Sequence, residues 1–95
     1  MPVAIEMDFP GGTLEQYDQV IEKMGLEPGG DVPDGAMFHW VAETPQGLRV
    51  VDVWETQEAF DKFAEEQIGP YSQEVGMESP QSTVHQVHNH LRPRG

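Results

Sequence analysis

The chain has 95 residues, carries 17 acidic against 5 basic residues for a formal net charge of −12, and contains no cysteine. That length predicts a single domain with a thin hydrophobic core, and the lack of cysteine excludes disulfides, thiolate nucleophiles and cysteine-based zinc sites. The acidic surplus argues against binding to nucleic acid, because a surface without a basic stripe repels phosphate groups.

No targeting or membrane segment is predicted. The N-terminal stretch "MPVAIEMDF" lacks a basic start followed by a long apolar run, and no segment reaches the roughly 18 apolar residues of a membrane span. We therefore expect a soluble, cytoplasmic protein with no membrane partner. Residues 1–91 are expected to form one domain, and residues 92–95 a frayed tail.

The first strand and helix are marked by a change in hydrophobic period. Residues 3–9 alternate between apolar and polar, which predicts a strand. Thr13 followed by Gln16 matches a capping box, and apolar residues then recur at helical spacing until Gly25. The sequence therefore predicts a helix over about 13–24 that ends at this glycine.

The segment "EPGGDVPDG", residues 27–35, is a long loop for so small a domain. It could be a mobile lid over a site or a plain solvated connection. The second interpretation is favoured, because loops of this composition are common.

Residues 36–43 and 48–55 read as two strands joined by the tight turn "TPQG". Thr56 can cap a following helix near 57–67, which "GP" at 69–70 is expected to break.

The remaining elements are a short helical turn over 71–76 that begins after Pro70, and a last strand over 82–91.

The order β-α-β-β-α-β predicts the ferredoxin-like α+β fold, in which two crossover units interleave. The four-stranded antiparallel sheet should have the first and third strands at its centre and both helices on one face. Apolar residues occupy both faces of the hairpin, with Phe38 and Trp40 on one and Met37 and Val41 on the other. A second subunit packing sheet on sheet would cover the bare face, which predicts a homodimer.

The stretch "VWETQEAFDKF", residues 53–63, resembles the dimeric α+β barrel superfamily and its antibiotic-biosynthesis monooxygenase-like members. The blocks "FHW" (38–40) and "VVDVWE" (50–55) are similar to those of a bacterial subgroup of small proteins. This resemblance implies a homodimer whose sheets pair into a barrel, with a ligand cavity between sheet and helices in each subunit. Some members oxidise polycyclic aromatic compounds without metal or flavin, and others degrade haem.

Haem degradation is disfavoured by two positions. The resemblance aligns Trp54 with a cavity tryptophan of the haem-degrading members, which also use an asparagine on the first strand and a histidine on the second helix. Here the first strand offers Glu6, Met7 and Asp8, and the second helix has no histidine.

A candidate catalytic pair follows from the hairpin register. If Thr44 pairs with Gly47, then His39 lies opposite Asp52 and Met37 opposite Trp54, at side-chain distances that allow contact. A carboxylate there would orient the imidazole and make an acid–base dyad. A turn longer by one residue would instead place Trp40 opposite Asp52. The pair could also be a purely structural hydrogen bond.

Aromatic residues are predicted to surround this pair, with Trp54 and Phe60 at one end of a pocket and Tyr17, Phe63 and Tyr71 as walls. Apolar walls with few polar groups are typical of small-molecule sites. The favoured function is binding of an aromatic or polyketide-like compound, with cofactor-independent monooxygenase-like chemistry and no metal. A non-catalytic ligand-binding or assembly domain is the alternative.

A metal-dependent isomerase-like activity is a lesser alternative, suggested by His88 and His90, which would share one face of the last strand.

Overall fold

The computed structural model describes residues 1–91 and 93. The strands are β1 (Val3–Pro10), β2 (Ala36–Thr44), β3 (Gly47–Trp54) and β4 (Gln81–Gln86). The helices are α1 (Leu14–Met24), α2 (Gln57–Phe63), a π-helical turn (Ala64–Ile68) and α3 (Gly69–Glu74). Most of the expected frayed tail, residues 92, 94 and 95, lies outside the described residues.

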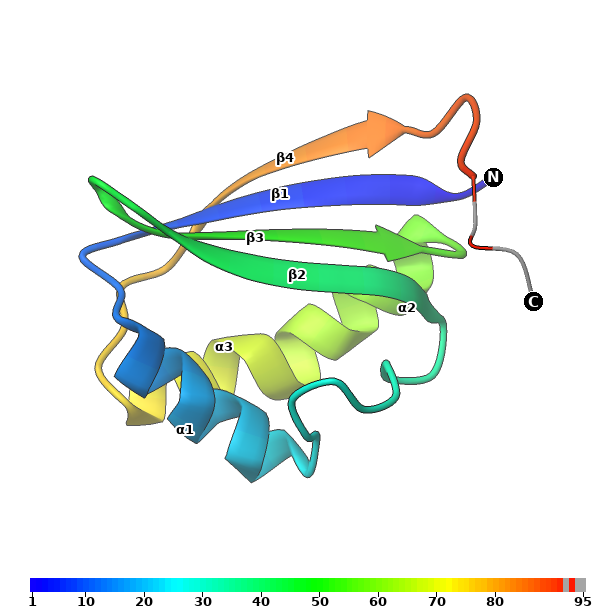
Figure 1. Cartoon of the computed structure of the whole chain (residues 1–95). Coiled ribbons are helices and arrows are strands. Elements are labelled where there is room, and N and C mark those ends of the chain that lie inside the picture. The colour runs from blue at the N-terminus through cyan, green and yellow to red at the C-terminus, as the bar shows by residue number, and fades with distance from the viewer. Residues whose placement is uncertain (92, 94–95) are drawn as a thin grey trace.

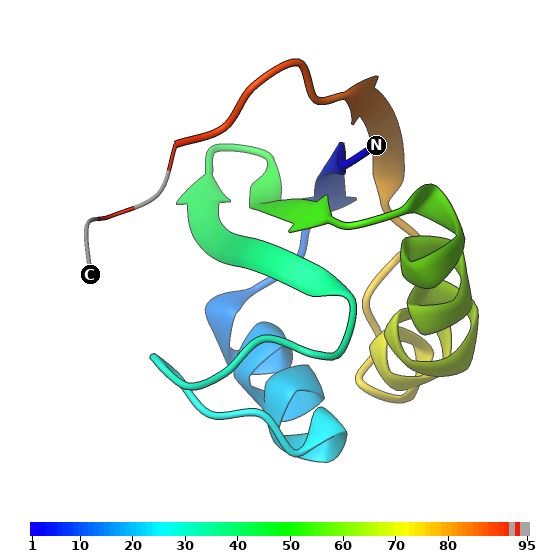
Figure 2. The same cartoon turned by 90° about the vertical axis from the view of Figure 1, so that its right-hand side faces the viewer.

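The fold is the predicted ferredoxin-like α+β arrangement. The four strands are antiparallel in the order β2-β3-β1-β4, which puts the first and third strands at the centre as expected. All the helices lie on one face of the sheet (Figure 1). Among the residues that the structure describes, none forms a helix on the opposite face, as the end-on view in Figure 2 shows. None of the helices in the described part of the chain is long and apolar enough to cross a bilayer.

Local signals in the sequence set the boundaries of β1 and α1. Along β1 every second residue is buried, from Val3 to Phe9. Thr13 and Gln16 form the predicted capping box, in which each side chain bonds to the other residue's backbone N–H. Gly25 ends α1 in the left-handed conformation, with φ of 78°.

The hairpin between β2 and β3 has a two-residue turn, as expected for the register that places His39 opposite Asp52. Thr44 pairs with Gly47, and His39 therefore pairs with Asp52. Gly47 has φ of 148°, and a Cβ atom there would lie 2.1 Å from the carbonyl oxygen of Phe9. Only glycine allows the turn to approach β1 this closely, so this residue helps fix the register of both strand pairs.

One predicted pairing is wrong. Trp54 lies opposite Ala36, because a β-bulge falls between Ala36 and Phe38 and leaves Met37 unpaired. The irregularity is confined to the start of β2, and the pairing from Phe38 onward follows the expected register.

The prediction that Gly69 and Pro70 break the second helix is also wrong, since the chain stays helical from Gln57 to Glu74. In a regular α-helix the Pro70 ring would clash with the carbonyl of Glu66. The π-helical turn widens the helix just before this point, and the Gly69 N–H donates to the carbonyl of Ala64, five residues back. A wider turn therefore accommodates the proline.

The last strand is shorter than predicted, because β4 ends at Gln86. Within the described part of the chain β4 is an edge strand that pairs with β1, and this pairing ends where Gln86 lies opposite Val3. His88 and His90 therefore do not share a strand face, and the observation behind a metal-dependent activity is lost.

The hydrophobic core lies between the sheet and the helices. Its buried apolar residues are Val3, Ile5, Met7, Phe9, Val20, Leu48, Val50, Trp54, Phe60, Ile68 and Met77. On the other face of the sheet Phe38 is 59% exposed and Trp40 is 40% exposed. The chain therefore has a conventional core on one face and an uncovered, partly apolar surface on the other.

Candidate functional site

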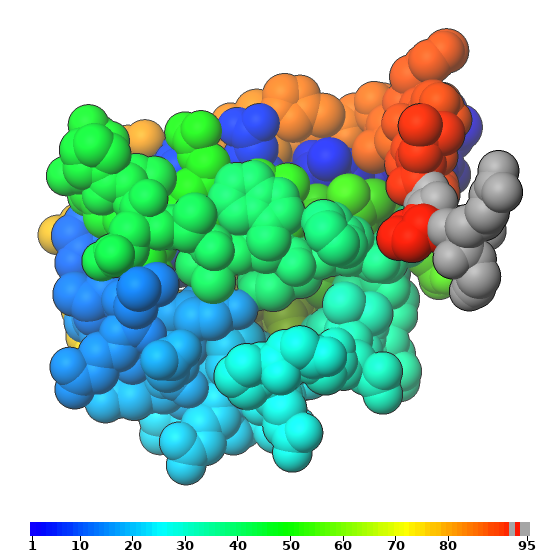
Figure 3. Space-filling model, in the orientation of Figure 1, coloured from blue at the N-terminus to red at the C-terminus, as the bar shows by residue number. Residues whose placement is uncertain are grey.

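An open cavity of about 1010 Å³ lies between the inner face of the sheet, α1 and the segment 26–33. Figure 3 shows α1 and this segment below β2, with a hollow between them. The segment 26–33 lines the cavity throughout. The favoured interpretation of the loop as a plain solvated connection was therefore incomplete, because it forms a wall of the cavity.

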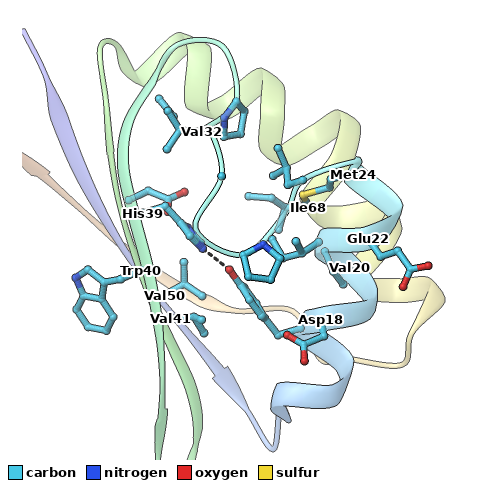
Figure 4. A pocket seen from close by; sticks show the side chains of 18 of the residues that line it. Asp18, Val20, Glu22, Met24, Val32, His39, Trp40, Val41, Val50 and Ile68 are labelled. Carbon is cyan, nitrogen blue, oxygen red and sulfur yellow. Dashed lines mark hydrogen bonds and ion pairs between the residues drawn. The ribbon is translucent and has the colours of Figure 1, made fainter.

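Four side chains from α1, β2 and β3 form a continuous hydrogen-bonded chain at this cavity. The Tyr17 hydroxyl lies 2.5 Å from Nε2 of His39, a contact marked by the dashed line at His39 in Figure 4. Nδ1 of His39 lies 2.5 Å from Oδ1 of Asp52. The second carboxylate oxygen, Oδ2, accepts a hydrogen bond of 3.1 Å from Nε1 of Trp54. All four residues line the cavity.

The direction of each hydrogen bond follows from the groups at the two ends. The Trp54 indole N–H can only donate, and an ionised Asp52 can only accept. Nδ1 of His39 then carries the proton that it donates to Asp52. In the neutral imidazole Nε2 is left as an acceptor, and the Tyr17 hydroxyl donates to it.

The exposed fraction differs among the side chains of this hydrogen-bonded series. Asp52 is 4% exposed and Trp54 is 1% exposed, whereas the His39 side chain is 29% exposed. A buried carboxylate is stable only when its oxygens are hydrogen-bonded, and here both oxygens have donors. Asp52 and Trp54 are thus the buried part of the hydrogen-bonded series, and His39 and Tyr17 are its more exposed part, on the cavity side.

Tyr17 holds its proton tightly. Burial, the charge of Asp52 and the charge of Asp18 raise the pKa of Tyr17 from 10.0 to about 12. Its hydroxyl is therefore neutral at physiological pH and serves as a hydrogen-bond donor. The rings of Tyr17 and His39 are nearly parallel, with an interplanar angle of 7° and centroids 5.9 Å apart. The 2.5 Å contact between hydroxyl and Nε2 is too short for stacked faces, so the rings meet end to end.

The mouth of the cavity is acidic. Asp18, Glu22, Glu27 and Asp31 belong to its lining and are exposed, and the described lining residues include no lysine or arginine. Figure 4 shows Asp18 and Glu22 on α1 beside the cavity. This arrangement disfavours entry of anionic ligands.

Five of the seven predicted site residues meet at the cavity: His39, Asp52, Trp54, Tyr17 and Phe63. The Phe63 ring lies 5.1 Å from that of Trp54. Phe60 is instead buried behind Trp54, edge to face at 5.9 Å, and does not line the cavity. Tyr71 is half-buried against the core and is also absent from the lining. Phe60 and Tyr71 were therefore misplaced, because helical spacing gives a face but not the depth of a side chain.

Sequence reasoning missed two features of the site. Tyr17 was expected only as a wall, although its hydroxyl is the partner of His39. Its position one turn into an amphipathic helix, with a polar tip on an apolar face, was the available signal. Ile68, Ser72 and Met77 also belong to the lining. Ile68 and Ser72 were not foreseen because the π-helical turn changes which residues of Gln57–Glu74 face the sheet, and Met77 lies in the connection after this helix.

Fold and geometry together define a ferredoxin-like α+β protein with an open cavity between its sheet and its first helix. The same fold is seen in a crystal structure from Deinococcus radiodurans that is provisionally assigned as an antibiotic biosynthesis monooxygenase, with a TM-score of 0.60, 11% sequence identity and 100% of both chains covered. No family model and no curated protein sequence matches the chain. The structural likeness confirms the fold expected from the resemblance to monooxygenase-like proteins.

Proposed function

We propose that this protein binds an uncharged aromatic compound with an acidic hydroxyl or enol group and promotes its oxidation by O2 without an organic cofactor. The observation that carries the proposal is the His39–Asp52 pair beside a cavity walled by aromatic side chains. The solved structure with the same fold is provisionally assigned to oxidative chemistry, and this assignment supports the reaction class.

In the proposed reaction His39 is the acid–base group and Asp52 orients it. Removal of a proton from an enolisable polycyclic ketone gives an electron-rich enolate, which O2 can oxidise. A ring CH2 becomes a carbonyl, one oxygen atom of O2 enters the product, and the other leaves as water with the two hydrogens. A dyad that stabilises the imidazolium lowers the cost of the first step.

Phe63 is proposed to hold the flat ring system by aromatic contact, with the buried Trp54 supporting its ring from behind. The acidic mouth favours an uncharged compound over a carboxylate or phosphate. The proposed reaction scheme does not require a metal ion.

A second candidate is a non-catalytic binding or assembly domain of the same fold. The partly apolar outer face of the sheet, with Phe38 and Trp40 exposed, favours it. We propose that this face pairs with a second copy of the chain in either case, because its exposed aromatic side chains are otherwise left in water.

Anthrone is a suitable probe, since it enolises and its oxidation consumes O2. The wild-type protein should bind anthrone and accelerate O2 uptake, and His39→Ala should lose the acceleration. His88→Ala is the matched control, because His88 is exposed, follows the end of β4 and does not line the cavity. Binding without O2 uptake would favour the non-catalytic candidate, and lack of binding would refute the proposed ligand class.

Trp54 is best tested with phenylalanine rather than alanine. Trp54 is almost fully buried, so truncation to alanine would cost about 3–5 kcal/mol of stability. Trp54→Phe keeps most of the packing but removes the N–H that donates to Asp52. It should weaken binding of anthrone without dissociating the proposed dimer.

A further inference from the structure

Both nitrogen atoms of the His39 ring are already occupied by protein groups. Nδ1 faces Asp52 at 2.5 Å, and Nε2 faces the Tyr17 hydroxyl at 2.5 Å. A ligand hydroxyl cannot reach either nitrogen while these contacts are in place. The proposed acid–base role of His39 therefore needs an intermediary between the imidazole and the ligand.

We propose that Tyr17 is a catalytic residue that passes the ligand's proton to His39, so that the phenol and not the imidazole touches the substrate. This inference rests on the proposed function, because it assigns the contact through which that reaction begins. The geometry carries it: Tyr17 on α1 lines the cavity, and its hydroxyl occupies Nε2, the nitrogen of His39 that does not face Asp52.

The transfer balances as two coupled steps. The ligand O–H bond breaks as its proton joins the Tyr17 oxygen, and the original Tyr17 O–H proton moves to Nε2 of His39. The products are a ligand oxyanion and an imidazolium ring, whose charge Asp52 neutralises through Nδ1–H. Nε2–H now donates to the Tyr17 oxygen, and the Tyr17 O–H now donates to the oxyanion. The same groups thus hold both states: the ligand–Tyr17 and Tyr17–His39 hydrogen bonds reverse in direction, the His39–Asp52 bond keeps its direction, and none is lost.

Tyrosine suits this role because it does not ionise itself. A tyrosinate beside Asp52 and Asp18 would be repelled by two carboxylates, the same charges that help to hold its pKa high. The residue therefore relays the proton without keeping the negative charge, which ends on the ligand.

The test uses 4-nitrophenol, a phenol that ionises near neutral pH and whose anion absorbs visible light. Bound to the wild-type protein below its own pKa, the probe should show a phenolate fraction several times that of the free probe. Tyr17→Phe should bind the probe within about threefold of wild type but show no excess phenolate, because the phenyl ring still blocks access to Nε2. His39→Gln should give the same spectrum, and the double variant should add nothing further.

The controls separate this inference from the proposed function. Tyr71→Phe alters the other tyrosine, which does not line the cavity, and should behave as wild type. Thermal melts establish that each variant is folded. If Tyr17→Phe still ionises the bound probe, His39 meets the ligand directly and the relay is overturned. If the wild type binds the probe without ionising it, the relay is also overturned but ligand binding stands. If the probe does not bind, the phenolic ligand class fails and the relay with it.

Discussion

Asp52→Asn should reverse the two hydrogen bonds of His39, to residue 52 and to Tyr17, while leaving the fold intact. The Trp54 N–H can only donate, so the new amide must turn its oxygen toward Trp54. Its NH2 group then faces Nδ1 of His39, which must become an acceptor. The imidazole proton moves to Nε2, and the Tyr17 hydroxyl changes from donor to acceptor.

The size of the effect depends on what is left unpaired. Asp52→Asn keeps both hydrogen bonds in neutral form, and should reduce the free energy of unfolding by about 1 kcal/mol. Asp52→Ala leaves the buried Trp54 N–H without an acceptor, which costs about 2 kcal/mol, and loses the charge-assisted bond to His39, worth about 1 kcal/mol because that ring is partly hydrated. The expected total for alanine is about 3 kcal/mol, a large share of the roughly 5–15 kcal/mol typical of a domain.

Chemical denaturation measures the two losses, and ¹⁵N NMR of the imidazole identifies the tautomer. Asp8→Asn is the control, because Asp8 is an exposed partner of Arg49 outside the cavity lining and its loss should have a much smaller effect. A variant Asp52→Asn that keeps the proton on Nδ1, or an alanine variant as stable as wild type, would refute the reasoning about donors and acceptors.

Three further outcomes are expected. Because the pKa of Tyr17 is raised to about 12 from 10.0, the folded state holds this proton longer than the unfolded chain, so stability is unaffected below pH 10 and falls between pH 10 and 12. A shift of two pKa units corresponds to a loss of ~2.7 kcal/mol of unfolding free energy at most, and water around the half-buried ring reduces this loss to about 1 kcal/mol. In denaturant titrations Tyr17→Phe should lack this part of the loss at alkaline pH. Moderate salt should leave the melting temperature unchanged or raise it, since the net charge of −12 is screened; a steady fall with added NaCl would contradict this. Sedimentation equilibrium at micromolar concentration should give a dimer that buries more than roughly 1,200 Å², and Trp40→Lys on the outer face should give a monomer; a wild-type monomer would defeat the idea.

The fold could be predicted because its signals are local. The alternation along β1, the capping box at Thr13 and Gln16, and the turn between Thr44 and Gly47 each depend on neighbouring residues. The turn alone then fixed the contact of His39 with Asp52, because a hairpin transmits its register along both strands.

The rest of the site depends on contacts that periodicity does not contain. The bulge at Met37 and the π-helical turn each add one residue to a regular element, and neither has a distinct sequence pattern. The depth of Phe60 and the partner of Tyr17 depend on how α1 and α2 sit on the sheet. Sequence reasoning therefore found the polar pair but not the phenol that completes it.

The π-helical turn also determines which length changes this chain can accept. Deleting one residue from Ala64–Ile68 would remove the wider turn that accommodates Pro70, and it would turn everything after it by about 100°. Ser72, now on the cavity side, would then rotate away from the cavity. The exposed stretch 27–32, in contrast, could gain or lose a residue without turning any helix. Insertions and deletions in homologous sequences should therefore be found in this loop and not in the helical stretch before Pro70.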